Sequence, residues 1–481
     1  MTDVDTVIVD TVIVGAGFAG LGAGIRLSRL GERSFVVLER AAAVGGTWRD
    51  NDYPGVACDI PSHLYSFSFA PKHDWSHFFA RGSEIQDYLR ECAREIEPRI
   101  RLGTDVLEMR WLAETERWSV RTSTGDYSCR TLVVAAGRLS EPRMPEIAGI
   151  DSFPGVAFHS SRYDHDVPIA GARVGVVGTG ASAVQLVPRV AEQAGSVVLF
   201  QRTAAHVVPR DDSEYSARDI LSFRNSPETR ERLRADLFWS MEAGFAERVA
   251  TPGYIDALRA RARGHLEAQV SDADLRDLLT PGYEIGCKRV LLSDDFYPAL
   301  ESGAVTLEPS ALVSIDGRTA IAASGAAHDL DVLIFATGFE STRPPFARRV
   351  FGRDGLSLDE AWGDGMVAYA STTVHGFPNL FVIDGPNASL GHNSAIVMIE
   401  AQIEYLLGAL HDESDVLEVS PDAQAAYVAE LDARAAATVW LGGGCESWYV
   451  DERSHRLTLL WPDFAYAFRD RLSAFDRAAY L

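Results

Sequence analysis

The stretch Thr11-Val12-Ile13-Val14-Gly15-Ala16-Gly17-Phe18-Ala19-Gly20 decides the fold of this 481-residue chain. An apolar run enters a G-x-G-x-x-G turn, and helix-forming residues leave it over positions 21–30, which is the context of a dinucleotide-binding unit. In such a unit Gly15 permits the tight turn, Gly17 lets backbone N–H groups approach a pyrophosphate, and Gly20 lets the helix pack on the strand. The stretch therefore predicts a diphosphate at a helix N-terminus.

The next apolar run supplies a second part of this site. Residues 34–38 are Ser-Phe-Val-Val-Leu, and Glu39 follows them directly. A carboxylate at the end of the second strand accepts hydrogen bonds from the ribose hydroxyls of a nucleotide. A glycine turn alone also occurs without a ligand, so the strand-helix context and Glu39 carry the prediction of nucleotide binding.

A second glycine turn follows the strand pattern of residues 173–177. It reads Gly178-Thr179-Gly180-Ala181-Ser182-Ala183, and the next apolar run, 196–200, leads into Gln201-Arg202-Thr203. Glu39 lies 24 residues after Gly15, and Arg202 lies 24 residues after Gly178, so the two residues occupy equivalent positions. The alternative interpretation of Arg202 is an ordinary surface arginine at a strand end.

The difference between these two positions predicts two different cofactors. A carboxylate accepts ribose hydroxyls and repels a 2′-phosphate, whereas a guanidinium pairs with that phosphate. The first turn therefore suits FAD and the second suits NADPH. The predicted NADPH site comprises Gly178, Gly180, Ser182, Arg202 and Thr203.

The length and the two turns together predict the architecture. A chain of 481 residues is too long for one core, and we expect an α/β protein with two Rossmann-like dinucleotide-binding domains, the second inserted in the first. The expected FAD domain comprises residues 1–146 and 345–481, and the expected NADPH domain comprises residues 150–340. Helical spacing predicts a helical insertion in the latter near 211–284.

The net charge, the length of the apolar runs and the spacing of cysteines and histidines argue against several classes of protein. The net charge is −23, which disfavours nucleic-acid binding, and no apolar run reaches the roughly 18 residues of a membrane span. The five cysteines contain no C-x-x-C pair, and the 12 histidines show no metal-ligand spacing. We therefore expect no metal site, no dithiol redox centre and a reduced, cytoplasmic protein.

Two further motifs carry a family resemblance. The loop Gly45-Gly46-x-Trp48-x4-Tyr53-Pro54-Gly55-x3-Asp59 lies after Glu39, and Phe153-x-Gly155-x3-His159-x3-Tyr163-Asp164 lies between the two turns. With these motifs in place the chain resembles the class B flavoprotein monooxygenases, and among them the Baeyer-Villiger monooxygenases. The resemblance extends from near residue 8 to near residue 462.

The resemblance implies roles for particular residues. The segment Cys287-Lys288-Arg289-Val290-Leu291 is similar to the one that carries the family's active-site arginine. Arg289 would lie beside the flavin, Lys288 would contact the NADPH 2′-phosphate, and Asp59 would be the partner of Arg289. Trp440 would face the nicotinamide end. Cofactor binding is also implied for Gly46, Thr47, Trp48, Asp59 and Tyr65.

The implied chemistry is oxygen insertion next to a ketone. Flavin reduced by NADPH would trap O2 as a C4a-peroxide, and a fixed arginine would stabilise the peroxide anion while an ester or lactone forms. One position departs from the pattern, because Tyr163 stands where the Baeyer-Villiger linker normally has tryptophan. Tyrosine there is usual in the monooxygenases that oxidise amines or sulfides at nitrogen or sulfur, which is the first alternative function.

Two other functions are weighed against this one. An NADPH-flavin disulfide reductase would need a redox-active cysteine pair, which the sequence pattern does not contain. A nucleotide-sensing flavoprotein without catalysis would have no need of Asp59 and Arg289. We expect the partners to be a small ketone, or a sulfide or amine, together with O2.

Overall fold

The fold is that of a computed structural model, which describes residues 6–31 and 33–481. A parallel five-stranded sheet surrounds the first glycine turn and has the strand order β20-β8-β2-β3-β4. Its strands are β2 (Thr11–Val14), β3 (Phe35–Leu38), β4 (Ile100–Arg101), β8 (Thr131–Val134) and β20 (Leu380–Val382). The chain therefore leaves this sheet after β8 and returns to it about 250 residues later.

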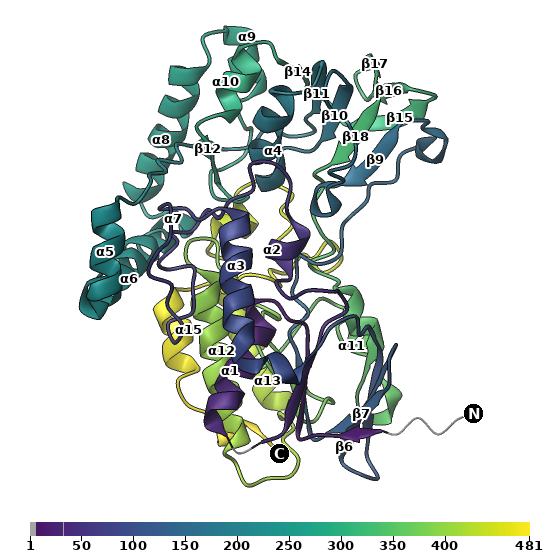
Figure 1. Cartoon of the computed structure of the whole chain (residues 1–481), viewed down its shortest axis with the longest axis vertical. Coiled ribbons are helices and arrows are strands. Elements are labelled where there is room, and N and C mark those ends of the chain that lie inside the picture. The colour runs from purple at the N-terminus through teal and green to yellow at the C-terminus, as the bar shows by residue number, and fades with distance from the viewer. Residues whose placement is uncertain (1–5, 32) are drawn as a thin grey trace.

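A second parallel sheet surrounds the second glycine turn and has the order β14-β11-β10-β18-β9. Its strands are β9 (Val156–His159), β10 (Arg173–Val177), β11 (Ser196–Phe200), β14 (Val305–Glu308) and β18 (Val332–Phe335). The neighbours β11-β10-β18 repeat the arrangement β3-β2-β8 of the first sheet. Figure 1 shows the second sheet at the top of the molecule and helices α1 and α12 below it. The predicted mixed α/β class with parallel sheets is confirmed.

Helices cover the first sheet and close its core. They are α1 (Phe18–Leu30), α3 (Gly82–Ala93), α12 (Ala395–Leu410), α13 (Pro421–Ala435) and α15 (Ala465–Arg471). Helix α12 is apolar on nearly every side and almost wholly buried against α1, as expected of a helix inside a core. It begins at Ser394, whose side chain accepts a hydrogen bond from the Ile396 N–H.

Helices also occupy the stretch between the second turn and β14. They are α4 (Ala181–Ala191), which follows the turn, then α5 (Ala217–Asn225), α6 (Pro227–Glu242), α7 (Phe245–Arg248), α8 (Tyr254–Gln269), α9 (Ala273–Leu278) and α10 (Phe296–Glu301). In Figure 1 helices α5, α6 and α8 lie along one side of the molecule. None of the described helices is long and apolar enough to cross a bilayer.

The remaining strands form three more sheets, and the one with five strands joins distant parts of the chain. Its order is β1 (Val7–Ile8), β7 (Asp126–Cys129), β6 (Arg117–Thr122), β5 (Val106–Leu112) and β19 (Val350–Phe351). The others are β12 (Val207–Val208) with β13 (Leu291–Leu292), and β15 (Leu312–Asp316), β16 (Thr319–Ala322) and β17 (Ala327–Asp329). Short helices are α2 (Thr47–Asp50), α11 (Leu358–Ala361) and α14 (Val439–Gly442). The domain limits expected from the sequence stay a prediction.

Candidate active site

The first glycine turn forms a cradle that has no room for side chains. Gly15 has φ +105°, and a Cβ on Gly15 would lie 2.4 Å from the Ala135 carbonyl oxygen. A Cβ on Gly20 would lie 1.8 Å from the Gly15 carbonyl oxygen, and one on Gly46 would lie 3.1 Å from the Gly17 Cα. Gly17 and Gly46 thus bring two backbones together at the start of α1, which suits the close approach of a diphosphate.

Glu39 is held rigidly at the end of β3. Its Oε2 accepts a hydrogen bond from the Ala16 N–H at 2.9 Å, and its Oε1 accepts from the Ala41 N–H at 2.9 Å. Arg49 also donates to Oε1 at 3.0 Å. Glu39 is only 5% exposed, so these three bonds offset the cost of burying its charge. The carboxylate is therefore preorganised beside the glycine turn.

A cleft with a volume of about 230 Å³ runs along this turn. Most residues that the sequence assigned to FAD line it: Gly15, Gly17, Glu39, Gly46, Thr47, Trp48 and Tyr65. The Trp48 Nε1–H donates to the Tyr65 hydroxyl at 3.2 Å, and the two rings meet edge to face. Gly20 does not line the cleft, because it packs against the Gly15 carbonyl group within the turn.

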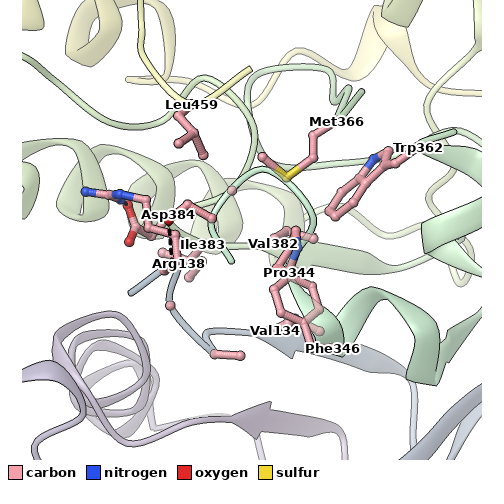
Figure 2. Close-up of a pocket in the computed structure, with 14 residues that line it drawn as sticks. Val134, Arg138, Pro344, Phe346, Trp362, Met366, Val382, Ile383, Asp384 and Leu459 are labelled. Atoms are coloured by element: carbon pink, nitrogen blue, oxygen red, sulfur yellow. Dashed lines mark hydrogen bonds and ion pairs between the residues drawn. The ribbon is translucent and has the colours of Figure 1, made fainter. Parts of the chain in front are cut away.

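Arg138 and Asp384 line the same cleft, and the sequence did not single them out as a pair. They follow β8 and β20, two neighbouring parallel strands, and they form an ion pair (Figure 2). Burial, together with the nearby charge of Arg289, lowers the pKa of Arg138 to about 10. Both stand at the carboxyl ends of strands, where ligands bind in open parallel sheets, and this position is the signal that could have identified them.

Arg138 and Asp384 also line a second, smaller pocket, which Figure 2 shows. This pocket is mainly apolar, with Phe346, Trp362 and Met366 among the residues that line it. The side chains of Arg138 and Asp384 are each only 14% exposed. The pair is therefore electrostatically stronger than it would be at the surface.

Arg289 and Asp59 form the ion pair that the family resemblance implied. The Arg289 Nε–H donates to Asp59 Oδ2 at 2.6 Å, and both side chains are about one quarter exposed. Burial opposes the charge of Asp59, but Arg289 and then Arg210 outweigh it and hold the pKa of Asp59 below its usual value. Asp59 in turn raises the pKa of Arg289 against the effect of burial. Both groups are therefore charged at neutral pH.

Two buried residues beside Arg289 were not predicted from the sequence. The Tyr449 residue is 1% exposed, and its hydroxyl has no hydrogen-bond partner among the described residues. Arg248, at the end of α7, donates Nη2 to the Gly391 carbonyl at 3.2 Å, while its Nη1 lies 3.4 Å from Glu247 Oε2 in an ion pair and makes no hydrogen bond among the described residues. Burial raises the pKa of Tyr449, and the charges of Arg289 and Arg248 oppose that rise, so the three side chains lie close together. Nothing in the helical spacing marks Arg248 among its many arginine neighbours.

The second glycine turn repeats the geometry of the first. Gly178 has φ +111°, and a Cβ there would lie 2.5 Å from the Ala336 carbonyl oxygen, whereas a Cβ on Gly180 would meet no heavy atom within 4 Å. Ser182 lies in the first turn of α4. The Thr179 hydroxyl donates to the Thr203 carbonyl at 2.7 Å and ties the turn to the strand end.

Arg202 and Lys288 lie close together at this second turn. Burial lowers the pKa of Lys288, and the nearby charge of Arg202 lowers it further. Lys288 contacts the Tyr283 ring, with Nζ 5.1 Å from the ring centre, and neither cation forms an ion pair within the described part of the chain. Glu446 acts on Lys288 and Arg202 acts on Glu452 from beyond ion-pair distance, and two adjacent cations of this kind suit a 2′-phosphate.

Trp440 lies deeper than the resemblance suggested. The residue is 2% exposed and packs near Phe245 and Tyr449. A Cβ on Gly391 would lie 2.8 Å from the Trp440 ring, so the indole is pressed against this backbone. Trp440 thus lies next to Tyr449, and its position at the nicotinamide end stays a prediction.

The expectation of a reduced protein is wrong for one pair of cysteines. Cys287 and Cys445 form a disulfide with a Cα–Cα distance of 6.2 Å, although 158 residues separate them. Cys58, Cys92 and Cys129 are free. A search for short C-x-x-C spacing does not detect such a pair, because only the tertiary fold brings the two segments together.

Known proteins are similar to this chain in sequence and in fold. A family model described as pyridine nucleotide-disulphide oxidoreductase matches residues 12–249. A Baeyer-Villiger monooxygenase of Streptomyces coelicolor is 42% identical, and the alignment covers 98% of this chain and 92% of that protein. An oxidised steroid monooxygenase bound to NADP is 30% identical with a TM-score of 0.83, covering 97% of both chains. The OTEMO complex with FAD and NADP is 27% identical with a TM-score of 0.85, and again covers 97% of both. This chain belongs to the Baeyer-Villiger monooxygenase family.

Proposed function

We propose that this protein is an NADPH- and O2-dependent flavin monooxygenase that converts a ketone into an ester or lactone. The Arg289–Asp59 ion pair carries this proposal, because it fixes a partly buried cation close to Arg138, which lines the cleft of the first glycine turn. Ketone oxidation develops negative charge on oxygen, and a preorganised arginine stabilises that charge. A protein that only binds nucleotides has no use for such a pair.

FAD fits the cleft of the first turn. We propose that Gly15, Gly17 and Gly46 receive its diphosphate and that Glu39 accepts the ribose hydroxyls. The same cleft is lined by Thr47, Trp48 and Tyr65, which come later in the sequence. We assign these three residues to the flavin half of FAD. Gly20 supports the turn without touching the ligand. The OTEMO structure, which contains FAD and NADP, shares the fold.

NADPH fits the second turn. We propose that Gly178, Gly180 and Ser182 hold its diphosphate at the N-terminus of α4. Arg202 and Lys288 supply two adjacent cations for the 2′-phosphate, and Thr203 continues the strand end. Trp440 forms part of the wall on the Arg289 side of the site.

The architecture follows from the same assignment. We propose an FAD domain of residues 1–146 and 345–481 and an NADPH domain of residues 150–340, with the helices near 211–284 beside the active site. The separate parallel sheets around the two turns support this division. Two chain crossings between such domains permit the relative rotation that coenzyme exchange needs.

The residues around Arg289 perform distinct tasks. When bound, FAD takes hydride from NADPH and activates O2 for transfer. Asp59 accepts the Arg289 Nε–H and so orients the guanidinium, which leaves both Nη groups to donate to a developing oxyanion. Tyr449 adds a neutral hydroxyl whose pKa is raised by burial, so it keeps its proton as a donor. Arg138 and Asp384 form an ion pair that lines the cleft.

Product analysis tests this proposal. The purified protein, reconstituted with FAD, is given NADPH, air and a panel of ketones, sulfides and amines. We expect ester or lactone from at least one ketone, with oxygen consumed in proportion. The alternative function, oxygenation at nitrogen or sulfur, is favoured by Tyr163. Sulfoxides or N-oxides as the sole products would support that alternative instead.

A further inference from the structure

The disulfide joins two segments that both reach the candidate active site. Cys287 precedes Lys288 and Arg289 directly in the chain, and Cys445 lies four residues before Tyr449. The first segment follows α9, and the second follows α14 near the C-terminus. The bond therefore ties the loop that carries Arg289 to the segment that carries Tyr449.

Noncovalent contacts already bring these segments together. The Glu284 N–H donates to the Gly443 carbonyl at 2.9 Å, and Ile285 and Val439 share one buried cluster. A Cβ on Gly443 would lie 2.7 Å from the Cys287 Cβ. The two sulfurs thus stay neighbours when the bond is open, which allows it to close again.

The two sulfurs differ in access. Cys287 is fully buried, whereas Cys445 is partly exposed and follows three consecutive glycines, residues 442–444. Gly444 has φ +72°, and a glycine-rich backbone adapts readily to movement. A reagent in solution therefore reaches Cys445. The buried Cys287 then reacts with the modified Cys445.

The other cysteines lack this arrangement. Cys58, Cys92 and Cys129 are unpaired, and burial raises the pKa of Cys92 to about 11 and that of Cys129 to about 12. Thiols with raised pKa values react slowly, because the thiolate is the nucleophile. Cys92 is partly exposed and serves as a matched control for Cys445.

We propose that Cys287 and Cys445 form a redox latch that hydrogen peroxide closes and a dithiol reductant opens. With the bond closed, the Arg289 loop is fixed against the Tyr449 segment, and activated oxygen is delivered to substrate. With the bond open, the loop moves more and part of the NADPH consumed yields hydrogen peroxide instead. That peroxide closes the latch and limits the leak. The inference rests on the proposed function, which is the source of the peroxide.

The chemistry balances in both directions. The Cys445 thiolate attacks one peroxide oxygen, so an S–O bond forms, the O–O bond breaks and hydroxide leaves as water after protonation. Cys287 then attacks the resulting sulfenic sulfur, the S–S bond forms, and a second water carries away the oxygen and the thiol proton. To open the latch, a reductant thiolate attacks the Cys445 sulfur and Cys287 leaves as thiolate; the second reductant thiol then releases Cys445.

Thiol titration of the denatured holoenzyme tests whether the latch forms. Of the five cysteines, three should react in the protein as purified and five after dithiothreitol treatment, and hydrogen peroxide should restore three. C287S and C445S should each show four in every state, and C92S should show two and then four. Five thiols in the untreated and peroxide-treated protein would overturn the proposal. Release of two thiols by NADPH alone would also overturn it, because the bond would then turn over with coenzyme.

The amount of hydrogen peroxide released per NADPH, called the leak here, tests whether the latch affects catalysis. Hydrogen peroxide released per NADPH is measured without ketone, so the result does not depend on which substrate the enzyme uses. Reduced unaltered protein, C287S and C445S should leak several-fold more than the oxidised protein, and peroxide should correct only the unaltered protein and C92S. Equal leaks from the oxidised and reduced forms would refute the latch. Failure to oxidise any ketone would instead count against the proposed function alone.

Discussion

Arg289 donates its Nε–H to Asp59 Oδ2 at 2.6 Å, although 230 residues of sequence separate them. Asp59 belongs to the loop after the first glycine turn, and Arg289 follows the helices beyond the second. The pair exists only when these two parts of the chain fold against each other. Chemistry at this point therefore depends on the tertiary contact between these two parts of the chain.

Loss of Asp59 should weaken oxygen transfer without abolishing it. In Asp59→Ala the guanidinium remains charged but loses the acceptor that orients it, so the ester formed per NADPH should fall and hydrogen peroxide should rise. The defect should be milder than that of Arg289→Ala. Asp52→Asn is the control, because Asp52 lies in the same loop and its side chain is 54% exposed. Equal coupling in Asp59→Ala and unaltered protein would argue against the pair.

Arg202 should set the coenzyme preference. A hydrogen bond to a charged group is worth about 1.5–3 kcal/mol, so Arg202→Ala should lose roughly one to two orders of magnitude of the preference for NADPH over NADH. The loss should appear in the KM for NADPH and leave NADH use unchanged. Arg218→Ala, an exposed arginine on α5, is the control. Equal use of both coenzymes by unaltered protein would contradict the assignment.

Lys288 should limit NADPH binding at alkaline pH. Burial and Arg202 lower its pKa, so the free enzyme should lose this charge as pH rises, and it should do so below the pH expected of an exposed lysine. The value of kcat/KM for NADPH should therefore decline on the alkaline side. Lys288→Arg should move that decline to higher pH, because arginine stays protonated. A profile that is identical in both proteins would show that Lys288 does not contact the phosphate.

The Tyr449 hydroxyl should promote oxygen transfer while lowering the stability of the folded protein. A buried hydroxyl without a partner costs free energy in the folded state, so Tyr449→Phe should keep or raise the Tm. Oxygen transfer should nevertheless slow, because a neutral donor beside Arg289 is lost. Calorimetry and ester yield measured on the same sample check both expectations. A lower Tm with normal ester yield would assign Tyr449 a purely structural role.

Two glycines should respond to alanine in opposite ways. A Cβ at Gly20 would lie 1.8 Å from the Gly15 carbonyl oxygen, so Gly20→Ala should distort the turn and lower the FAD content of the purified protein. Gly264 lies within α8, where a Cβ meets no heavy atom within 4 Å. Gly264→Ala should retain FAD and gain about 0.5–1 kcal/mol of stability. Full FAD content in Gly20→Ala would contradict the proposed cradle.

The parts of the structure that depend on local pattern were predictable from the sequence. Both glycine turns, the strands before and after them and the equivalent positions of Glu39 and Arg202 follow from short-range spacing. The Arg289–Asp59 pair followed from a family resemblance, because no spacing rule connects residues 230 positions apart.

The parts that were missed depend on distant segments meeting. The mixed sheet pairs β1 with β7 and β5 with β19, and its two outer strands are only two residues long. Such strands are too short for a periodic signal. The Cys287–Cys445 bond and the approach of Arg248 to Arg289 likewise arise only in the tertiary fold.

Ester or lactone formed per NADPH consumed, in unaltered protein and in Arg289→Ala, tests the central claim most directly. The unaltered protein should couple NADPH oxidation to ester formation. Arg289→Ala should still oxidise NADPH but release hydrogen peroxide, since the loss of one such donor costs about 2.7–4 kcal/mol, or roughly a hundredfold to a thousandfold in ester formation. The claim is contradicted if the unaltered protein yields only sulfoxides or N-oxides, or if Arg289→Ala forms ester as efficiently as before.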